Sequence, residues 1–235
     1  MDVKKFFSAF LEGLNTLVKM PLFMLLSLVL WGLLLGVSKI GGRIVVNFQS
    51  TTSNVLWIIV AGLVSFSLIS YFSSGLIGLT QKKELKNFFV QGNKNWFRNL
   101  LVLLVILVST AAVWAIAHYG TLYFGRTLNL DAAVAKWIFI WVYVTGLVGF
   151  LIFFSFASFF LVLHNRPVVG ALSESFRFVK RNYFTTLFLM IVFFALYFLV
   201  NFVEGAVGDL LLFGLLFPYL IIVFTRILNT ADLKK

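Results

Sequence analysis

Six long apolar segments are the feature that most constrains how this chain folds. They occupy residues 21–39, 55–79, 100–118, 136–163, 184–203 and 210–228, and each is close to or above the ~20 residues that a helix needs to cross a bilayer. Hydrophobic residues make up 61% of the sequence and charged residues 11%, against roughly 45–50% and 25% in soluble domains. The sequence therefore predicts an all-α polytopic membrane protein, with six transmembrane helices forming three hairpins in one domain, residues 1–235.

The segments between these spans set the expected connections. Pro21 and Pro167 are expected near helix starts, where a missing N–H costs little. We expect loops at residues 41–53 and 119–133 and a tight turn at 204–209. The fourth span, residues 136–163, is longer than a bilayer requires and is expected either to tilt or to project from the membrane.

A basic segment with helical amphipathic spacing precedes each predicted hairpin, at residues 1–20, 82–98 and 164–181. Such helices are suited to the headgroup plane on the cytoplasmic face, with their cations near lipid phosphates. The residues predicted to face lipid or a partner are Lys4, Lys5, Lys19, Lys86, Lys94, Arg98, Arg177, Lys180 and Arg181.

The three basic segments also align with one another around a small residue. Gly13, Gly92 and Ser175 occupy the matching position and lie roughly 80 residues apart. One interpretation is an internal repeat with units 1–79, 80–163 and 164–235. The other is that three membrane junctions share a composition without duplication, and the sequence leaves both open.

Orientation follows from the side on which the basic residues fall. With both termini cytoplasmic, the external side carries only Lys39, Arg43, Arg126 and Lys136, as the positive-inside rule requires. The apolar residues near Met1 are interrupted by polar ones, so no cleavable signal peptide is expected. The net charge of +11 would suggest nucleic-acid binding in a soluble protein. Here the positive-inside rule already explains where the basic residues lie, so we predict no nucleic-acid partner.

Several kinds of chemistry find no support in the sequence. The chain has no cysteine, which excludes disulfides, iron–sulfur clusters and thiol nucleophiles. His118 and His164 are expected at opposite membrane faces, too far apart to share a metal. No phosphate-binding loop, nucleophile elbow or zinc-protease motif is present. We therefore predict no catalytic residues, no metal site, no cofactor and no enzymatic activity.

An alternative prediction comes from polar and helix-breaking residues inside the spans. Pro218 is expected to kink the sixth span and free a carbonyl near Gly214. Small residues at helical spacing serve either close helix packing or a hydroxyl-lined path. The residues of this predicted path are Ser67, Ser70, Ser74, Asn201 and Pro218.

Residues 171–183, with the sequence ALSESFRFVKRNY, resemble a recurrent junction in a group of prokaryotic six-helix membrane proteins. That group includes the membrane domain attached to some glycerophosphodiester phosphodiesterases. The resemblance implies a six-helix bundle with interfacial or re-entrant helices in a prokaryotic plasma membrane. In the fused proteins a separate soluble domain carries the chemistry, so the resemblance implies no activity and transfers no catalytic residue.

These observations lead to two hypotheses for function. The first is a non-enzymatic membrane module that engages anionic membrane lipids, a membrane-protein partner or a second copy through its basic amphipathic helices. The second is a small transporter or channel with a pathway among the three hairpins.

Overall fold

The computed structural model describes residues 3–47, 51–128, 130–203 and 205–232. Within these residues six segments are long and apolar enough to cross a membrane, which confirms the predicted all-α polytopic fold. The regular elements are all helical: α1 (Val3–Lys19), α2 (Leu22–Asn47), α3 (Thr51–Gln81), α4 (Leu85–Thr127), α5 (Ala132–Phe154), α6 (Ala157–Leu163), α7 (Val168–Arg181), α8 (Tyr183–Asn201), α9 (Ala206–Leu211), a π-helical turn (Leu212–Leu216) and α10 (Phe217–Asp232).

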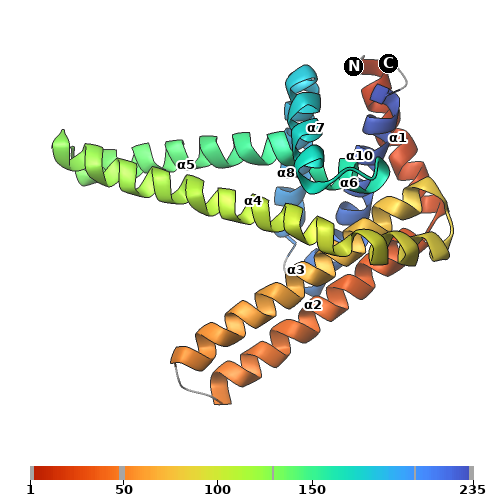
Figure 1. The fold of residues 1–235 in the computed structure, drawn as a ribbon, viewed down its shortest axis with the longest axis horizontal. Helices are drawn as coiled ribbons and strands as arrows, with labels where there is room; N and C mark the ends of the chain where they lie inside the picture. The colour runs from red at the N-terminus through yellow and green to blue at the C-terminus, as the bar shows by residue number, and fades with distance from the viewer. Residues whose placement is uncertain (1–2, 48–50, 129, 204, 233–235) are drawn as a thin grey trace.

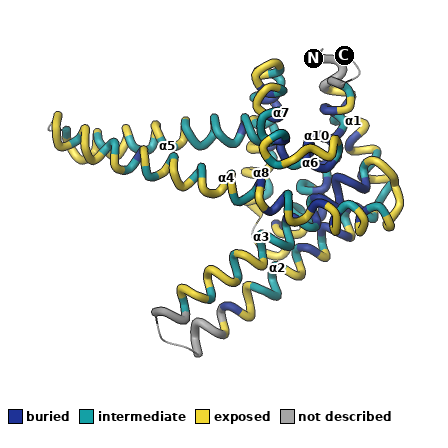
Figure 2. The backbone as a smooth tube through the Cα atoms, viewed as in Figure 1, coloured by how far each residue is buried: buried dark blue, intermediate teal, exposed yellow. Residues whose placement is uncertain are grey.

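The hairpins converge at one end of the molecule and diverge away from it. Figure 1 shows the α2–α3 and α4–α5 hairpins pointing in different directions from a common core, with the two chain ends side by side. We call the convergent region, formed by α1, residues 85–98 of α4, α6, α7 and the C-terminal half of α10, the junction end. Buried residues gather there, whereas the outer parts of both hairpins are largely exposed (Figure 2).

Two predicted helix starts are confirmed. The first span begins at Leu22, directly after Pro21, and this proline separates it from α1. Pro167 is the N-terminal cap of α7, with an extended backbone at φ −65° and ψ 160°. In both places proline stands where a backbone N–H would have no helical partner.

The two predicted long loops are wrong, because both lie largely within helices. α4 continues to Thr127 and α5 begins at Ala132, capped by the Asp131 carboxylate, which accepts from the Ala133 N–H at 3.3 Å. α2 runs to Asn47 and α3 starts at Thr51, and residues 48–50 lie outside the described part. Packing extends these helices beyond the apolar spans. A Cβ added at Gly41 of α2 would meet the Trp57 ring of α3, and one at Gly125 of α4 would lie 3.7 Å from the Ala135 side chain of α5.

The fourth span is not one continuous helix. It breaks at Ser155 and Phe156 into α5 and α6. The Ser175 hydroxyl on α7 accepts a hydrogen bond from the Phe156 N–H at 3.2 Å and donates one to the Phe153 carbonyl at 2.7 Å. Because a backbone break inside an apolar environment needs partners for its polar groups, Ser175 allows the chain to bend here.

The sixth span departs from regular α-helix beside Pro218. The turn Leu212–Leu216 is π-helical, and the Phe217 N–H donates to the Leu212 carbonyl. A widened turn of this kind is one way for a helix to accommodate a proline that cannot donate. Gly214 lies in this turn against the side chain of Leu28 on α2.

Replacing Ser175 with alanine tests the role of its hydroxyl. Ser175→Ala removes both hydrogen bonds at the buried break, and we expect the free energy of unfolding to fall by about 1–3 kcal/mol. The measurement is the thermal unfolding midpoint in detergent. Ser173→Ala on the same helix is the matched control, and equal midpoints for the two variants would contradict this role.

Candidate functional site

Each basic amphipathic helix packs against a membrane span through its small residue. A Cβ added at Gly13 of α1 would lie 2.8 Å from Val223 of α10, and one at Gly92 of α4 would lie 3.0 Å from the Tyr71 ring of α3. Ser175 of α7 is fully buried and bonds to the α5–α6 break. The three positions that align in the sequence therefore have the same structural use, the close approach of a basic helix to an adjacent span.

Helix α1 is held on α10 by contacts on both sides of Gly13. Ala9 and Leu17 are buried with it on one face of α1. The Tyr219 hydroxyl donates to the Phe10 carbonyl at 3.1 Å, and the Phe10 ring stacks on Phe193 of α8 at 6.0 Å. The first helix of the chain is thereby fixed to its last span.

One ion pair also joins the two ends of the chain. The Arg226 guanidinium of α10 forms a salt bridge with the Glu12 carboxylate of α1 and donates to the Thr16 hydroxyl at 2.7 Å. The Ser8 hydroxyl donates to the other carboxylate oxygen of Glu12 at 2.8 Å. The arginine and glutamate side chains are 34% and 54% exposed. Because water screens such a pair, it contributes little to stability, and its main effect is to fix the orientation of the Arg226 guanidinium.

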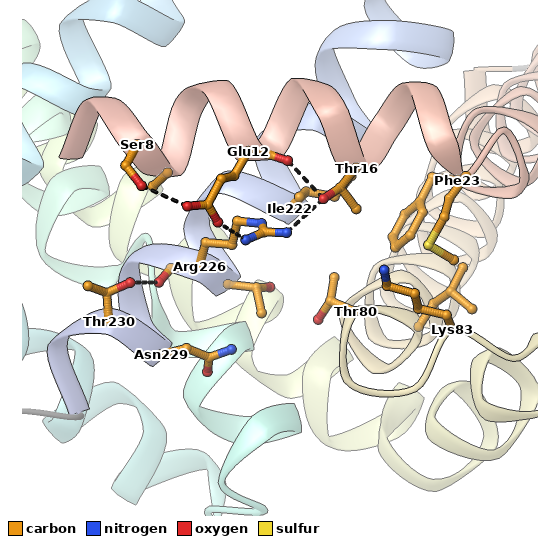
Figure 3. A pocket seen from close by; sticks show the side chains of 14 residues that line it. Ser8, Glu12, Thr16, Phe23, Thr80, Lys83, Ile222, Arg226, Asn229 and Thr230 are labelled. Carbon is orange, nitrogen blue, oxygen red and sulfur yellow. Dashed lines mark hydrogen bonds and ion pairs between the residues drawn. The ribbon is translucent and has the colours of Figure 1, made fainter. Parts of the chain in front are cut away.

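The ion pair borders a pocket of about 480 Å³ at the junction end. Figure 3 shows α1 along one side of it, Arg226 and Asn229 of α10 on another, and Thr80 and Lys83 facing them. The lining residues are Ser8, Ala9, Glu12, Thr16, Met20, Phe23, Leu79, Thr80, Lys83, Ile222, Thr225, Arg226, Asn229 and Thr230. They divide into hydroxyl, amide and charged groups and a set of apolar side chains.

The charges around this pocket favour an anion. Arg226 and Lys83 are cationic, and Glu12 is the one carboxylate among the lining residues. Lys83 lies in the turn between α3 and α4, is exposed, and has no ion pair among the described residues. An ammonium and a guanidinium facing one space can bind an anionic oxygen group by charge-assisted hydrogen bonds.

The predicted basic residues lie at the junction end but outside this pocket. Arg98 is half-buried and donates to the Asn165 side chain at 3.3 Å. Lys4 and Lys5 belong to α1, but their side chains lie outside the described part. The remaining members of the predicted set are exposed: Lys19, Lys86, Lys94, Arg177, Lys180 and Arg181.

The residues of the predicted pathway are not brought together. Ser67 and Asn201 donate to carbonyls of their own helices, at 2.7 and 2.8 Å. The Ser70 hydroxyl donates to the Trp96 carbonyl across the α3–α4 contact. Ser74 is buried, without a hydrogen bond to any described residue, and Pro218 is buried beside the π turn.

The α3–α4 contact contains further buried amides. Asn95 donates to Gln91 within α4 at 2.8 Å. Across the contact, Asn99 of α4 donates to the Ser70 carbonyl of α3 at 3.2 Å and to the Ser73 hydroxyl at 2.9 Å. Interhelical hydrogen bonds of this kind hold helices together in lipid, where apolar area alone gives no drive to associate. This polar cluster acts in helix packing.

Sequence reasoning missed the pocket, because its lining comes from three distant stretches of the chain. Glu12 and Arg226 are 214 positions apart. Arg226 gave one signal, as a single charge within an otherwise apolar span, since such charges normally have partners. Glu12 gave no such signal, because it lies among other polar residues in the amphipathic segment 1–20. Their pairing required the fold.

The described residues include no group of three histidine, aspartate or glutamate side chains placed to hold a metal ion. His118 instead stacks on Trp114 at 5.0 Å within α4. Comparison of the chain with protein-family models, with curated proteins and with solved structures found no match.

A cysteine pair tests whether α1 packs on α10. The natural chain has no cysteine, so Gly13→Cys with Val223→Cys gives a single thiol pair, at a distance that suits a disulfide. We expect efficient oxidative cross-linking in membranes, read as a mobility shift on a non-reducing gel. Leu11→Cys with Val223→Cys is the control, because Leu11 is exposed on another face of α1. Equal cross-linking of the two pairs would contradict the packing.

A charge exchange tests the ion pair. Arg226→Glu places two carboxylates together, and we expect it to lower the free energy of unfolding by about 1 kcal/mol, as suits a half-exposed pair. Adding Glu12→Arg should restore most of this loss. Thermal midpoints of the two single variants and the double variant provide the measurement, and simple additivity of the two changes would show that the residues do not interact.

Proposed function

We propose that this protein is a non-enzymatic integral membrane module that binds anionic lipid at its junction end. In this proposal it resides in a prokaryotic plasma membrane, with both termini and the junction end on the cytoplasmic side. The observation that carries the proposal is the concentration of exposed lysine and arginine side chains around three helices at this end, beside spans that are nearly free of charge.

The acidic residues of the junction helices do little to cancel this charge. Glu12 pairs with Arg226 and Glu174 pairs with Arg166 at 2.8 Å, while Glu84, exposed in the α3–α4 turn, is a single carboxylate beside the many exposed lysines and arginines of this end. The exposed cations therefore keep their charge for external groups. Each lysine or arginine near an anionic membrane surface contributes about 1 kcal/mol of attraction, so several together give a stable association.

Apolar side chains on α1 support an interfacial position. Phe7, Leu11, Leu14 and Val18 are each more than half exposed, on faces of the helix that do not contact α10. A helix with exposed aromatic and aliphatic groups beside cations is suited to the boundary between headgroups and acyl chains. The opposite face, with Gly13, is occupied by protein contacts.

The charge distribution supports the proposed orientation. The expected external cations lie at the far ends of the α2–α3 and α4–α5 hairpins, away from the junction end. Cytoplasmic loops carry the excess of lysine and arginine in membrane proteins, which favours the junction end as the cytoplasmic side. A transport pathway has less support, because Ser67, Ser70 and Asn201, three of the four polar residues assigned to it, donate to helix backbones.

Neutralising the basic helices tests the lipid proposal. A variant with Lys4, Lys5, Lys86, Lys94, Arg177 and Lys180 all changed to glutamine should retain about tenfold less anionic lipid, because it loses several surface attractions. Native mass spectrometry after extraction in mild detergent counts the lipids that remain bound.

The matched control changes the expected external cations Lys39, Arg43, Arg126 and Lys136 to glutamine. This variant should retain anionic lipid as the natural protein does. Unchanged retention in the six-residue variant, with the protein still folded, would refute the proposal.

A further inference from the structure

We propose that the pocket between α1, α10 and the α3–α4 turn binds the phosphate group of a single anionic phospholipid, with Lys83 and Arg226 as its cationic ligands. This inference rests on the proposed function and deepens it, because it assigns one defined binding site in addition to the general attraction of the basic helices. It also gives a role to Lys83, which is not among the residues predicted to face lipid or a partner.

The charge balance of the pocket matches a phosphodiester. Arg226, Lys83 and Glu12 together leave one positive charge, which a monoanionic phosphate neutralises. Glu12 and the Thr16 hydroxyl hold the guanidinium of Arg226 in a fixed orientation. A cation that is already positioned loses less side-chain freedom when it binds an anion.

The donors left for a ligand can be identified, because most hydroxyls of the pocket are already committed. Thr80 donates to the Ile77 carbonyl at 2.6 Å, and Thr230 donates to the Arg226 carbonyl at 2.8 Å. Lys83 and the Asn229 amide make no hydrogen bond to any described residue. Together with the remaining N–H groups of Arg226, they supply donors from two sides of the pocket (Figure 3).

The apolar part of the lining distinguishes a lipid from free phosphate. Met20 borders the pocket and is only half-buried, next to Phe23, Leu79 and Ile222, which also line it and are almost fully buried. A small inorganic ion gains nothing from such surfaces, whereas the glycerol ester region of a phospholipid brings apolar atoms to them.

The depth of the pocket in the membrane agrees with a headgroup site. It lies where α2 begins, where α3 ends at Gln81, and near the end of α10. Helix ends of transmembrane spans lie at the level of the lipid headgroups. A phospholipid beside the bundle would therefore present its phosphate at the height of Lys83.

The test uses dihexanoyl phosphatidylglycerol, a short-chain soluble lipid whose phosphate is a monoanionic diester, titrated into the intact protein in non-ionic detergent and followed by native mass spectrometry. Lys83→Gln removes one cationic ligand, and Asn229→Trp fills the pocket at an exposed position. Each should weaken binding by about tenfold, the effect expected for losing charge-assisted hydrogen bonds. Lys82→Gln, the exposed neighbour that does not line the pocket, should bind as the natural protein does.

Two results would overturn the assignment. If Lys83→Gln and Asn229→Trp bind the lipid as tightly as the natural protein, the pocket is not the site. The proposed function is tested separately by the six-residue variant, because that variant leaves the pocket lining unchanged. If inorganic phosphate displaces the lipid at equal concentration, the site selects free phosphate and the lipid assignment is wrong. Thermal midpoints confirm that each variant is folded.

Discussion

Close backbone approach at the junction end is the interaction on which the rest of this structure depends. In lipid, apolar surface gives helices no reason to associate, so small residues and interhelical hydrogen bonds must hold them. Gly13 and Gly92 let α1 and α4 approach neighbouring spans, and Ser175 satisfies the backbone at the α5–α6 break. Where these contacts end, the hairpins diverge (Figure 1).

This packing also determines where charge can reside. Because the spans carry few ionisable groups, the polar chemistry of the protein is confined to helix ends, where water and headgroups supply solvation. The contact of α1 with α10 brings Glu12 to Arg226 and closes one side of the pocket, and the α3–α4 turn adds Lys83. The proposed lipid site is thus a consequence of how the first and last helices of the chain meet.

The sequence predicted the spans and the helix starts because hydropathy, length and proline are local signals. It predicted loops at residues 41–53 and 119–133 wrongly, because packing between antiparallel helices extends them past the apolar stretch. The break at Ser155 also escaped prediction, since its partner Ser175 is 19 to 22 positions away. The pocket required the pairing of residues from both ends of the chain, and hydrophobic periodicity carries no information about such pairs.

The most direct test of the central claim is the composition of the lipids that copurify with the unmodified protein. The protein is extracted in mild detergent, and its bound lipids are compared with the total lipid of the same membrane by mass spectrometry. Lipid binding at the junction end predicts a clear enrichment of anionic phospholipids over zwitterionic ones. A bound-lipid composition equal to that of the membrane would contradict the account.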